Sequence, residues 1–431
     1  MHLQKLKLIW YFAYKEILLT RMSSLLVSAI IACGVITSAV TIKLYQTMSS
    51  VPLQDANELY VPLVDMWGPG GWDGGAPPPA LDYFDAISLV NERRARGQSA
   101  VYQIDAAVRS IGKPYDRHAL GYAVSHDFFK MFNVPFAHGS DWHVDGGIMQ
   151  DYEVVISHRL AMALFHTDNS VGKDIAVNGR SYQIVGVMKD WHPVPRVFDV
   201  INDGGFEARP VDFFIPLASA VAQGIKNSGF RYCNSKLLKK SFENIEHSTC
   251  IWIGYFVKLD GPQEYNSYLA YLTSYASEQQ LAGRFTWRPN VRLLSIRDWL
   301  KYMHVVPNSA SVSALVSVCF LLICVVNSSG ILMSNFMRRE RAFILHRALG
   351  ASSSDLRAII FTYAFIVGVF GALWGWLGLE SILFVLRREL PFALSDKMHL
   401  DLELLLVVFS TSVLSLVASA VAPAIRCSRL A

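Results

Sequence analysis

The sequence predicts a membrane protein with four transmembrane α-helices and a large α+β extracytoplasmic domain of two lobes, inserted between helices 1 and 2. Four apolar segments are each long enough to cross a hydrocarbon core of about 30 Å at about 1.5 Å per residue. The first two are separated by about 260 residues, enough to bury a core of their own. Of the 431 residues, 52% are hydrophobic and 17% are charged, which fits a membrane protein with a large water-facing part.

The chain begins with an expected amphipathic helix over residues 1–21, followed by the first transmembrane helix over 22–44. Trp10, Ala13 and Tyr14 share one side of the first helix while the lysines lie elsewhere, a pattern typical of a helix in the membrane interface. A cleaved signal peptide is the alternative. The apolar run is longer than the roughly 7 to 15 residues of a signal, which favours a retained helix.

Residues 45–305 are predicted to form the α+β domain, because runs with β-strand character alternate with helical patterns. Strands are expected at 100–104, 119–124, 152–156, 181–187, 213–217 and 251–259, and helices at 126–132, 158–165 and 263–282. Of the six cysteines, Cys233 and Cys250 lie in this domain. An oxidising compartment favours a disulfide between them, worth about 3 kcal/mol by loop entropy, and two free buried thiols are the alternative.

The remaining segments follow in close succession. We expect transmembrane helices at 306–337, 356–379 and 404–425, a cytoplasmic helix at 338–355, a short external loop at 380–403 and a tail at 426–431. Basic clusters precede the first span and follow the second and the fourth. Because Lys and Arg are retained on the cytoplasmic side during insertion, four crossings place all three clusters and both termini in the cytoplasm.

The second span is predicted to run without a break into the basic segment that follows it. Arg338 and Arg339 mark the cytoplasmic face, and Gly350 is expected to end the helix. One stiff helix would then leave the membrane and present a rigid contact element. The alternative is that these bases only set the topology.

Four glycines of the third span fall on one helical face because they are spaced three, four and three residues apart. They are Gly368, Gly371, Gly375 and Gly378. Small residues at this spacing let another helix approach closely. Packing inside the bundle is one interpretation, and a sliding or dimer-forming face is the other.

No catalytic motif is present in the sequence. It has no His-Glu-x-x-His, Cys-x-x-Cys, Gly-x-Ser-x-Gly or Gly-x4-Gly-Lys-Ser/Thr pattern, and its twelve histidines are scattered singly. We therefore assign no catalytic residue, no metal site and no cofactor in this chain. The net charge of +4 is accounted for by bases that flank the membrane, so we infer no nucleic-acid partner.

Two groups of motifs resemble the MacB/FtsX-like ABC transporter permeases, and together they cover nearly the whole chain. The first runs from Cys324-Val-Val-Asn to Arg347-Ala-Leu-Gly-Ala. The second, similar to the MacB-like periplasmic core domain, includes Val124-Ser-x-Asp-Phe-Phe, Val154-Val-Ile-Ser and Ile184-Val-Gly-Val-Met-Lys-Asp. The family usually has a Glu at the position that Ala342 holds here, so contacts of the cytoplasmic helix are expected to differ.

The resemblance implies a type VII ABC architecture in the bacterial inner membrane. Two permeases, identical or paralogous, form a dimer, and the cytoplasmic helix of each docks on a separate ATPase that binds ATP and Mg. Motion of this coupling helix would be transmitted to the periplasmic domains, which is called mechanotransmission. The expected ATPase-coupling residues are Arg341, His346, Arg347, Ala348, Leu349 and Gly350.

Export of a drug, peptide or other small molecule in a tripartite efflux assembly is the leading expectation. The periplasmic domain would then meet an adaptor and an outer-membrane channel. The alternatives are a lipoprotein-releasing permease and an FtsX-like regulator that transports nothing and activates a cell-wall hydrolase.

Overall fold

The computed structural model describes most of the chain in two compact units. The described residues are 2–51, 53, 55–68, 71–112, 116–125, 127–142, 152–202, 209–233, 250–285, 287–306, 308–348, 350–390, 398–399 and 401–430. One unit comprises Met1–Ser49 with Val306–Ala431, and the other is Ser50–Val305. We call the first the helical bundle and the second the external domain. The external domain is therefore inserted between two helices of the bundle.

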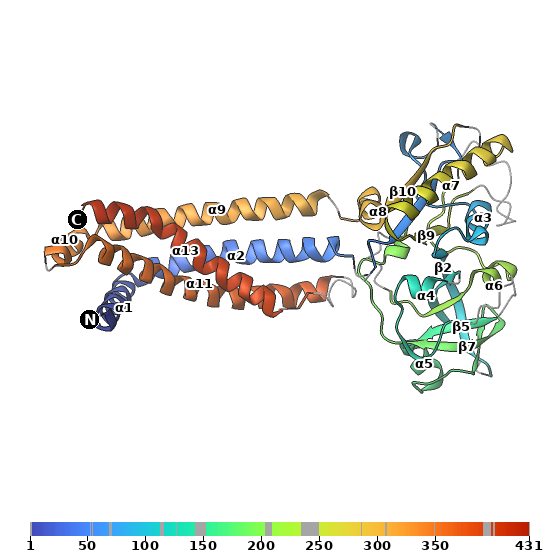
Figure 1. The fold of residues 1–431 in the computed structure, drawn as a ribbon. Helices are drawn as coiled ribbons and strands as arrows, with labels where there is room; N and C mark the ends of the chain where they lie inside the picture. The colour runs from blue at the N-terminus through green and yellow to red at the C-terminus, as the bar shows by residue number, and fades with distance from the viewer. Residues whose placement is uncertain are drawn as a thin grey trace. The chain divides into compact units, whose positions relative to one another are not determined.

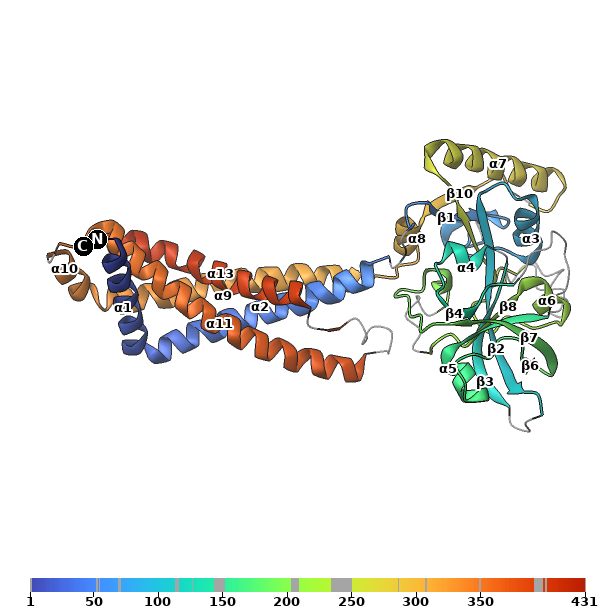
Figure 2. The ribbon, with the colours of Figure 1, turned by 60° about the horizontal axis from the view of Figure 1, so that its bottom comes forward.

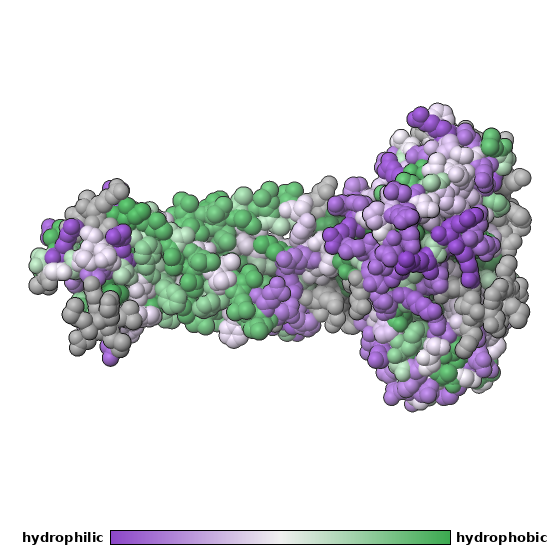
Figure 3. Space-filling model, in the orientation of Figure 1, coloured by the Kyte–Doolittle hydropathy of each residue, from purple (hydrophilic) through white to green (hydrophobic). Residues whose placement is uncertain are grey.

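The helical bundle consists of long apolar helices with two shorter ones (Figure 1). Its helices are α1 (His2–Leu19), α2 (Arg21–Ser49), α9 (Asn308–Met337), α10 (Glu340–Ala348), α11 (Ser353–Glu389) and α13 (Leu402–Leu430). Of the described helices, α2, α9, α11 and α13 are long and apolar enough to cross a membrane. Their surface is largely hydrophobic in Figure 3, as lipid contact requires. The predicted four-span fold is confirmed.

Helix α11 lies at the centre of the packing inside the bundle. It contacts α13, α2 and α1, while α9 packs against α2 and α13. Figures 1 and 2 show α1, α10 and the C-terminal end of α13 at the same end of the bundle. We call this the α10 end. The basic segments that the sequence analysis grouped together therefore lie at one end of the helices.

Two predicted segments have different limits in the structure. The helix expected at 338–355 is shorter, because α10 covers Glu340–Ala348 and α11 already begins at Ser353. The loop expected at 380–403 also starts later, because α11 continues to Glu389. An ion pair between Arg387 and Glu380, 2.7 Å apart, lies along these additional turns.

The external domain is built on one twisted β-sheet. Within the described residues, ten strands join in the order β10-β1-β9-β2-β3-β8-β5-β7-β4, and β6 pairs with β2 and β7. The strands are β1 (Leu59–Val64), β2 (Gly97–Ser110), β3 (Arg117–Val124), β4 (Phe136–Gly139), β5 (Glu153–Ser157), β6 (Asp174–Val177), β7 (Arg180–Met188), β8 (Phe213–Pro216), β9 (Gly254–Lys258) and β10 (Val291–Ser295). All six predicted strand regions belong to this sheet. Strands β1, β4, β6 and β10 were not predicted.

A hydrophobic core covers each face of the sheet, because successive side chains of a strand point to opposite faces. On β2, Tyr102 and Ile104 join one core and Val101 joins the other. The first core is covered by α3 (Tyr83–Glu92), α5 (His158–Phe165), α6 (Leu217–Ala222) and α7 (Gly261–Leu281), the second by α4 (Phe128–Met131) and α8 (Ile296–Tyr302). The α+β class is confirmed. The division into two lobes is not, since a single sheet runs through the unit.

Candidate functional site at the α10 end of the bundle

Two turn residues, Arg338 and Arg339, separate α9 from α10. The N–H of Arg339 donates to the Phe336 carbonyl at 3.1 Å, an i to i−3 bond, where an α-helix makes i to i−4 bonds. The prediction of one continuous helix is therefore wrong. We call these two residues the α9–α10 joint.

Aromatic packing explains the break at the joint. The ring centroids of Phe336 and Phe343 lie 5.9 Å apart. Seven residues of straight helix would separate them by about 10 Å along the axis. Phe336 also lies against Tyr363 of α11, with ring centroids 5.3 Å apart, and Phe343 is only 4% exposed. Burying Phe343 against this cluster turns α10 toward the bundle, so α10 does not continue the line of α9.

The end of α10 is closed by a Schellman motif at Gly350. The N–H of Ala351 donates to the His346 carbonyl at 3.1 Å, and the N–H of Gly350 donates to the Arg347 carbonyl at 2.9 Å. Gly350 has φ +99°, which favours glycine. Ser352 then starts α11 with a capping box to Asp355. The stop expected at Gly350 is present, and α10 is bounded on both sides by defined backbone geometry.

The exposed side of α10 carries a mainly apolar stripe. Arg341, Ile344, Leu345 and Ala348 are all exposed, and their spacing of three, one and three residues places them on one helical face. Ile344 is 47% exposed and Leu345 is 59% exposed. We call these four residues the α10 stripe. Apolar side chains with an arginine at the edge make a surface suited to contact with another protein.

Of the predicted coupling residues, Arg341 and Ala348 belong to the α10 stripe. Arg341, Arg347, Ala348 and Gly350 are exposed, and His346 is half-buried. Leu349 lies outside the described residues. Sequence analysis missed Ile344 and Leu345. In the sequence they stand out only as an apolar pair next to basic residues. That they face outward follows from the burial of Phe343, which fixes the side of α10 that packs on the bundle.

The four glycines of α11 all contact other helices of the bundle. A Cβ atom added at Gly368 would lie 3.1 Å from the Val413 Cα atom, and one at Gly375 would lie 3.3 Å from Val408, both on α13. At Gly371 and Gly378 the nearest atoms belong to α2, at 3.5 Å and 2.6 Å. Close approach of α2 and α13 to α11 accounts for the glycine spacing.

The external domain holds a buried network of charges between α3 and the end of α7. Asp82 and Asp85 are 2% and 0% exposed. Arg284 contacts both carboxylates, at 3.0 Å and 2.6 Å, and the Tyr275 hydroxyl donates to Asp85 at 2.7 Å. Burial, followed by the neighbouring Asp85 carboxylate, raises the pKa of Asp82 to about 8. The pKa of Asp82 is therefore raised mainly by its burial, although Arg284 contacts both carboxylates.

Cys233 and Cys250 form a disulfide in the external domain, with their Cα atoms 4.4 Å apart. The residues between them, 234–249, lie outside the described residues. Among the residues that the structure describes, no group of three or more His, Cys, Asp or Glu side chains is placed to hold a metal ion. The exposed residues of the α10 stripe make the α10 end the candidate functional site.

Two family descriptions match the chain. The MacB-like periplasmic core domain matches residues 24–262, and the FtsX-like permease C-terminal region matches residues 314–431. The first match alone covers more than half of the 431 residues. The second includes the joint, α10 and the glycine face. No curated protein matches the chain.

Three solved structures are similar to the external domain at low sequence identity. The periplasmic region of MacB from Actinobacillus actinomycetemcomitans is 14% identical, with 57% of this chain and 92% of that chain covered and a TM-score of 0.36. The extracellular domain of the noncanonic ABC-type transporter YknZ from Gram-positive bacteria is 11% identical, with coverages of 54% and 99% and a TM-score of 0.35. A domain of a permease protein from Porphyromonas gingivalis is 12% identical, with coverages of 56% and 92% and a TM-score of 0.34.

Proposed function

Because the chain belongs to the family of MacB/FtsX-like ABC transporter permeases, we propose that it couples ATP hydrolysis by a partner ATPase to movement of its external domain. The chain itself is proposed to be non-catalytic, with ATP and Mg bound by the partner. It would lie in the bacterial inner membrane with both termini and α10 in the cytoplasm. The three basic clusters support this orientation.

The α10 stripe is the observation that carries this proposal. Ile344 and Leu345 are exposed on a helix that leaves the membrane, where apolar side chains gain from contact with a partner. Arg341 and Arg347 flank them and add positive charge for acidic groups on the ATPase. The stripe, together with His346 and Gly350, is the proposed docking surface.

Motion would pass from α10 to the membrane helices through the aromatic cluster. Since α9 and α10 are separate helices, a push on α10 is not carried along one rod. It reaches α9 through the contact between Phe343 and Phe336, and α11 through Tyr363. Buried side chains in contact transmit displacement because they are close-packed. Helix α2 and helix α9, which flank the external domain in the sequence, would carry the motion onward.

A second permease copy or a paralogue is proposed to complete the assembly. Helix α9 has the smallest buried share among the four candidate spans. Leu315, Val316 and Val326 are 66%, 59% and 69% exposed on it. We place the dimer contact along α9, with exposed Cys319 as a native reporter. Oxidative cross-linking between copies at Cys319, absent in Cys319→Ser, would support this arrangement.

Export of a small molecule or peptide, with a periplasmic adaptor and an outer-membrane channel, is the proposed physiological role. The size of the external domain, Ser50–Val305, supports contact with further periplasmic components. Efflux that depends on this chain and on ATP is the expected result. Unchanged efflux combined with a cell-shape defect on deletion would instead favour the regulator of a cell-wall hydrolase.

The docking step is tested with a photo-cross-linking amino acid at Leu345. Irradiation of intact cells followed by mass spectrometry is expected to identify an ABC ATPase bound at this position. The same amino acid at Leu281, which is 89% exposed in the external domain, is the matched control and should not capture the ATPase. Capture of no ABC ATPase at Leu345 would overturn the proposed function.

A further inference from the structure

The α9–α10 joint requires something to fix its angle. Arg338 and Arg339 lie in neither helix, and residues at the ends of elements are where hinges absorb changes in backbone angle. The direction of α10 therefore depends on side-chain contacts on both sides of the joint. The Phe336–Phe343 contact supplies one of them.

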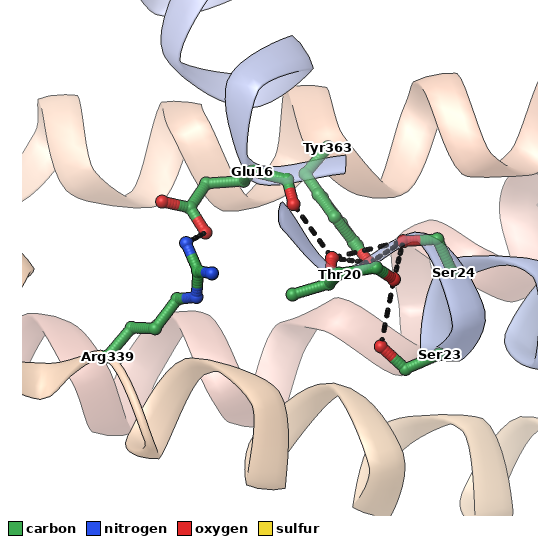
Figure 4. A network of polar contacts seen from close by, with 6 residues as sticks. All are labelled: Glu16, Thr20, Ser23, Ser24, Arg339 and Tyr363. Carbon is green, nitrogen blue, oxygen red and sulfur yellow. Dashed lines mark hydrogen bonds and ion pairs between the residues drawn. The ribbon is translucent and has the colours of Figure 1, made fainter. Parts of the chain in front are cut away.

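A second contact comes from the N-terminal helix. A Glu16 carboxylate oxygen of α1 lies 3.0 Å from an Arg339 guanidinium nitrogen (Figure 4), and the two side chains are 15% and 26% exposed. Ion pairs withdrawn from water are screened less than surface pairs. This pair joins α1 to the joint across 323 positions of sequence.

Glu16 lies where a carboxylate is otherwise unfavourable. It is the only acidic residue among the first 54. It falls in the last turn of α1, where the helix dipole favours cations. Neither the basic character of this segment nor the helix itself accounts for an acidic residue at position 16. The ion pair with Arg339 accounts for it.

Helix α1 also reaches the far end of α10. The rings of Phe12 and His346 are 4.6 Å apart in an edge-to-face arrangement. Phe12 and Glu16 are four residues apart and share one face of α1. This face therefore touches α10 near its last turn and the joint at its start. Two contacts along one helix fix a direction, which one contact cannot do.

The end of α1 is itself anchored to the membrane helices. The Thr20 hydroxyl donates to the Glu16 carbonyl at 2.8 Å and lies 3.2 Å from the Ser24 hydroxyl. Ser24 in turn lies 2.6 Å from the Tyr363 hydroxyl of α11 (Figure 4). Tyr363 packs on Phe336, next to the joint. Glu16 thus extends from a support that is fixed to α11 and α9.

From these contacts we infer that Glu16 is a positioning residue that holds the angle of α10 through Arg339. The inference rests on the proposed function of α10 as the docking helix and adds α1 to the docking apparatus. Loss of the ion pair leaves α10 attached by its aromatic contacts but free to change direction. Docking of the ATPase then weakens, although no residue of the α10 stripe has changed.

The angle can be measured without the ATPase. Spin labels are placed at the exposed residues Leu8 on α1 and Leu345 on α10, after replacement of Cys33, Cys319, Cys324 and Cys427 by serine. Electron–electron resonance in lipid vesicles is expected to give one narrow distance distribution. Glu16→Gln and, independently, Arg339→Gln should broaden it. The charge-swapped pair Glu16→Arg with Arg339→Glu should restore it, and Lys15→Gln, the exposed neighbour, should leave it unchanged.

Photo-cross-linking at Leu345 supplies the second measurement. The yield of ABC ATPase should fall about fivefold in Glu16→Gln, the scale of one half-buried ion pair, and return in the charge-swapped pair. A distance distribution that stays narrow in both single variants overturns the inference. Absence of any ABC ATPase product in the unmodified chain overturns the proposed function instead, whatever the spin labels report.

Discussion

The external domain and the helical bundle both bury polar side chains, but they satisfy them in different ways. In the external domain, fully buried Asp85 is paired with Arg284 and Tyr275. In the bundle, hydroxyls bond to backbone carbonyls of neighbouring helices, as Ser38 does with Ser317 at 2.9 Å and Ser419 does with Val325 at 3.0 Å. Charge buried in the external domain is compensated by an opposite charge and a hydrogen bond, whereas a lipid environment favours neutral groups. The charged contacts of the bundle accordingly lie near helix ends.

The largest expected effect comes from a substitution in the proposed docking surface on α10. Leu345→Asp places a charge in the α10 stripe and should lower ATP-dependent activity by at least about tenfold, since the buried centre of an interface tolerates no unpaired charge. Activity in cells and cross-linking to the ATPase are the measurements. Leu281→Asp in the external domain is the control. Equal losses in the two variants would contradict a specific role of the stripe.

Removal of the disulfide should destabilise the external domain and leave the bundle unchanged. The bond joins residues separated by 17 positions, so Cys233→Ser with Cys250→Ser should cost about 3 kcal/mol. Thermal unfolding of residues 50–305, a compact unit with its own cores, measures the effect. Hydrogen exchange of α11 in the full chain is the control. A change of equal size in α11 would show that the two regions do not unfold independently.

Replacing a glycine of α11 with a larger residue should destabilise the helical bundle and leave the external domain unchanged. Gly368→Leu forces atoms against the Val413 backbone and should destabilise the bundle by about 2 kcal/mol. Gly330→Leu on α9 is the matched control when both variants are compared as monomers, because nothing in the monomer lies within 4 Å of its Cβ position. Thermal stability in detergent distinguishes them. Similar melting temperatures for both variants would mean that the α11 glycines are not needed for packing.

A pH dependence confined to the external domain is also expected. Because the pKa of Asp82 is raised to about 8, the folded state holds a proton that the unfolded state releases near pH 4. Stability should therefore fall as the pH rises from about 4 to about 8. Asp82→Asn should flatten this part of the profile of residues 50–305. An unchanged slope would assign the dependence to other groups.

The regular elements of both regions could largely be predicted from local pattern. Strand β7 and helix α5 follow from alternation and helical spacing in their own residues. Strands β4 and β6 have four residues each, too few to show a period. Strand β1 was missed because its neighbours β10 and β9 come from the far end of the domain. Its burial is a property of the sheet and cannot be seen in six residues alone.

The position of the candidate site in the chain could be predicted from the sequence, but the break between α9 and α10 and the exposed face of α10 could not. The bases and Gly350 identified the segment, and Gly350 ends α10 as expected. The break at Arg338 and Arg339 could not be predicted, since residues 338–348 include no Gly or Pro and most of them are good helix formers. It results from Phe343 packing on Phe336 and from Glu16, which is distant in sequence. Outward-facing Ile344 and Leu345 depend on that same packing.

The length of α11 has a consequence for how the chain sits in lipid. Between Arg357 and Glu380 it carries 22 uncharged residues, about 33 Å of helix, which matches the thickness of a hydrocarbon core. The turns from Glu380 to Glu389 add about 15 Å beyond this distance. When the 22 uncharged residues span the hydrocarbon core, these turns extend beyond it at the end of α11 opposite α10. In a thicker bilayer the same turns allow α11 to shift along its axis with Arg387 and Arg388 reaching to the headgroups, so the helix can follow changes in membrane thickness without unwinding.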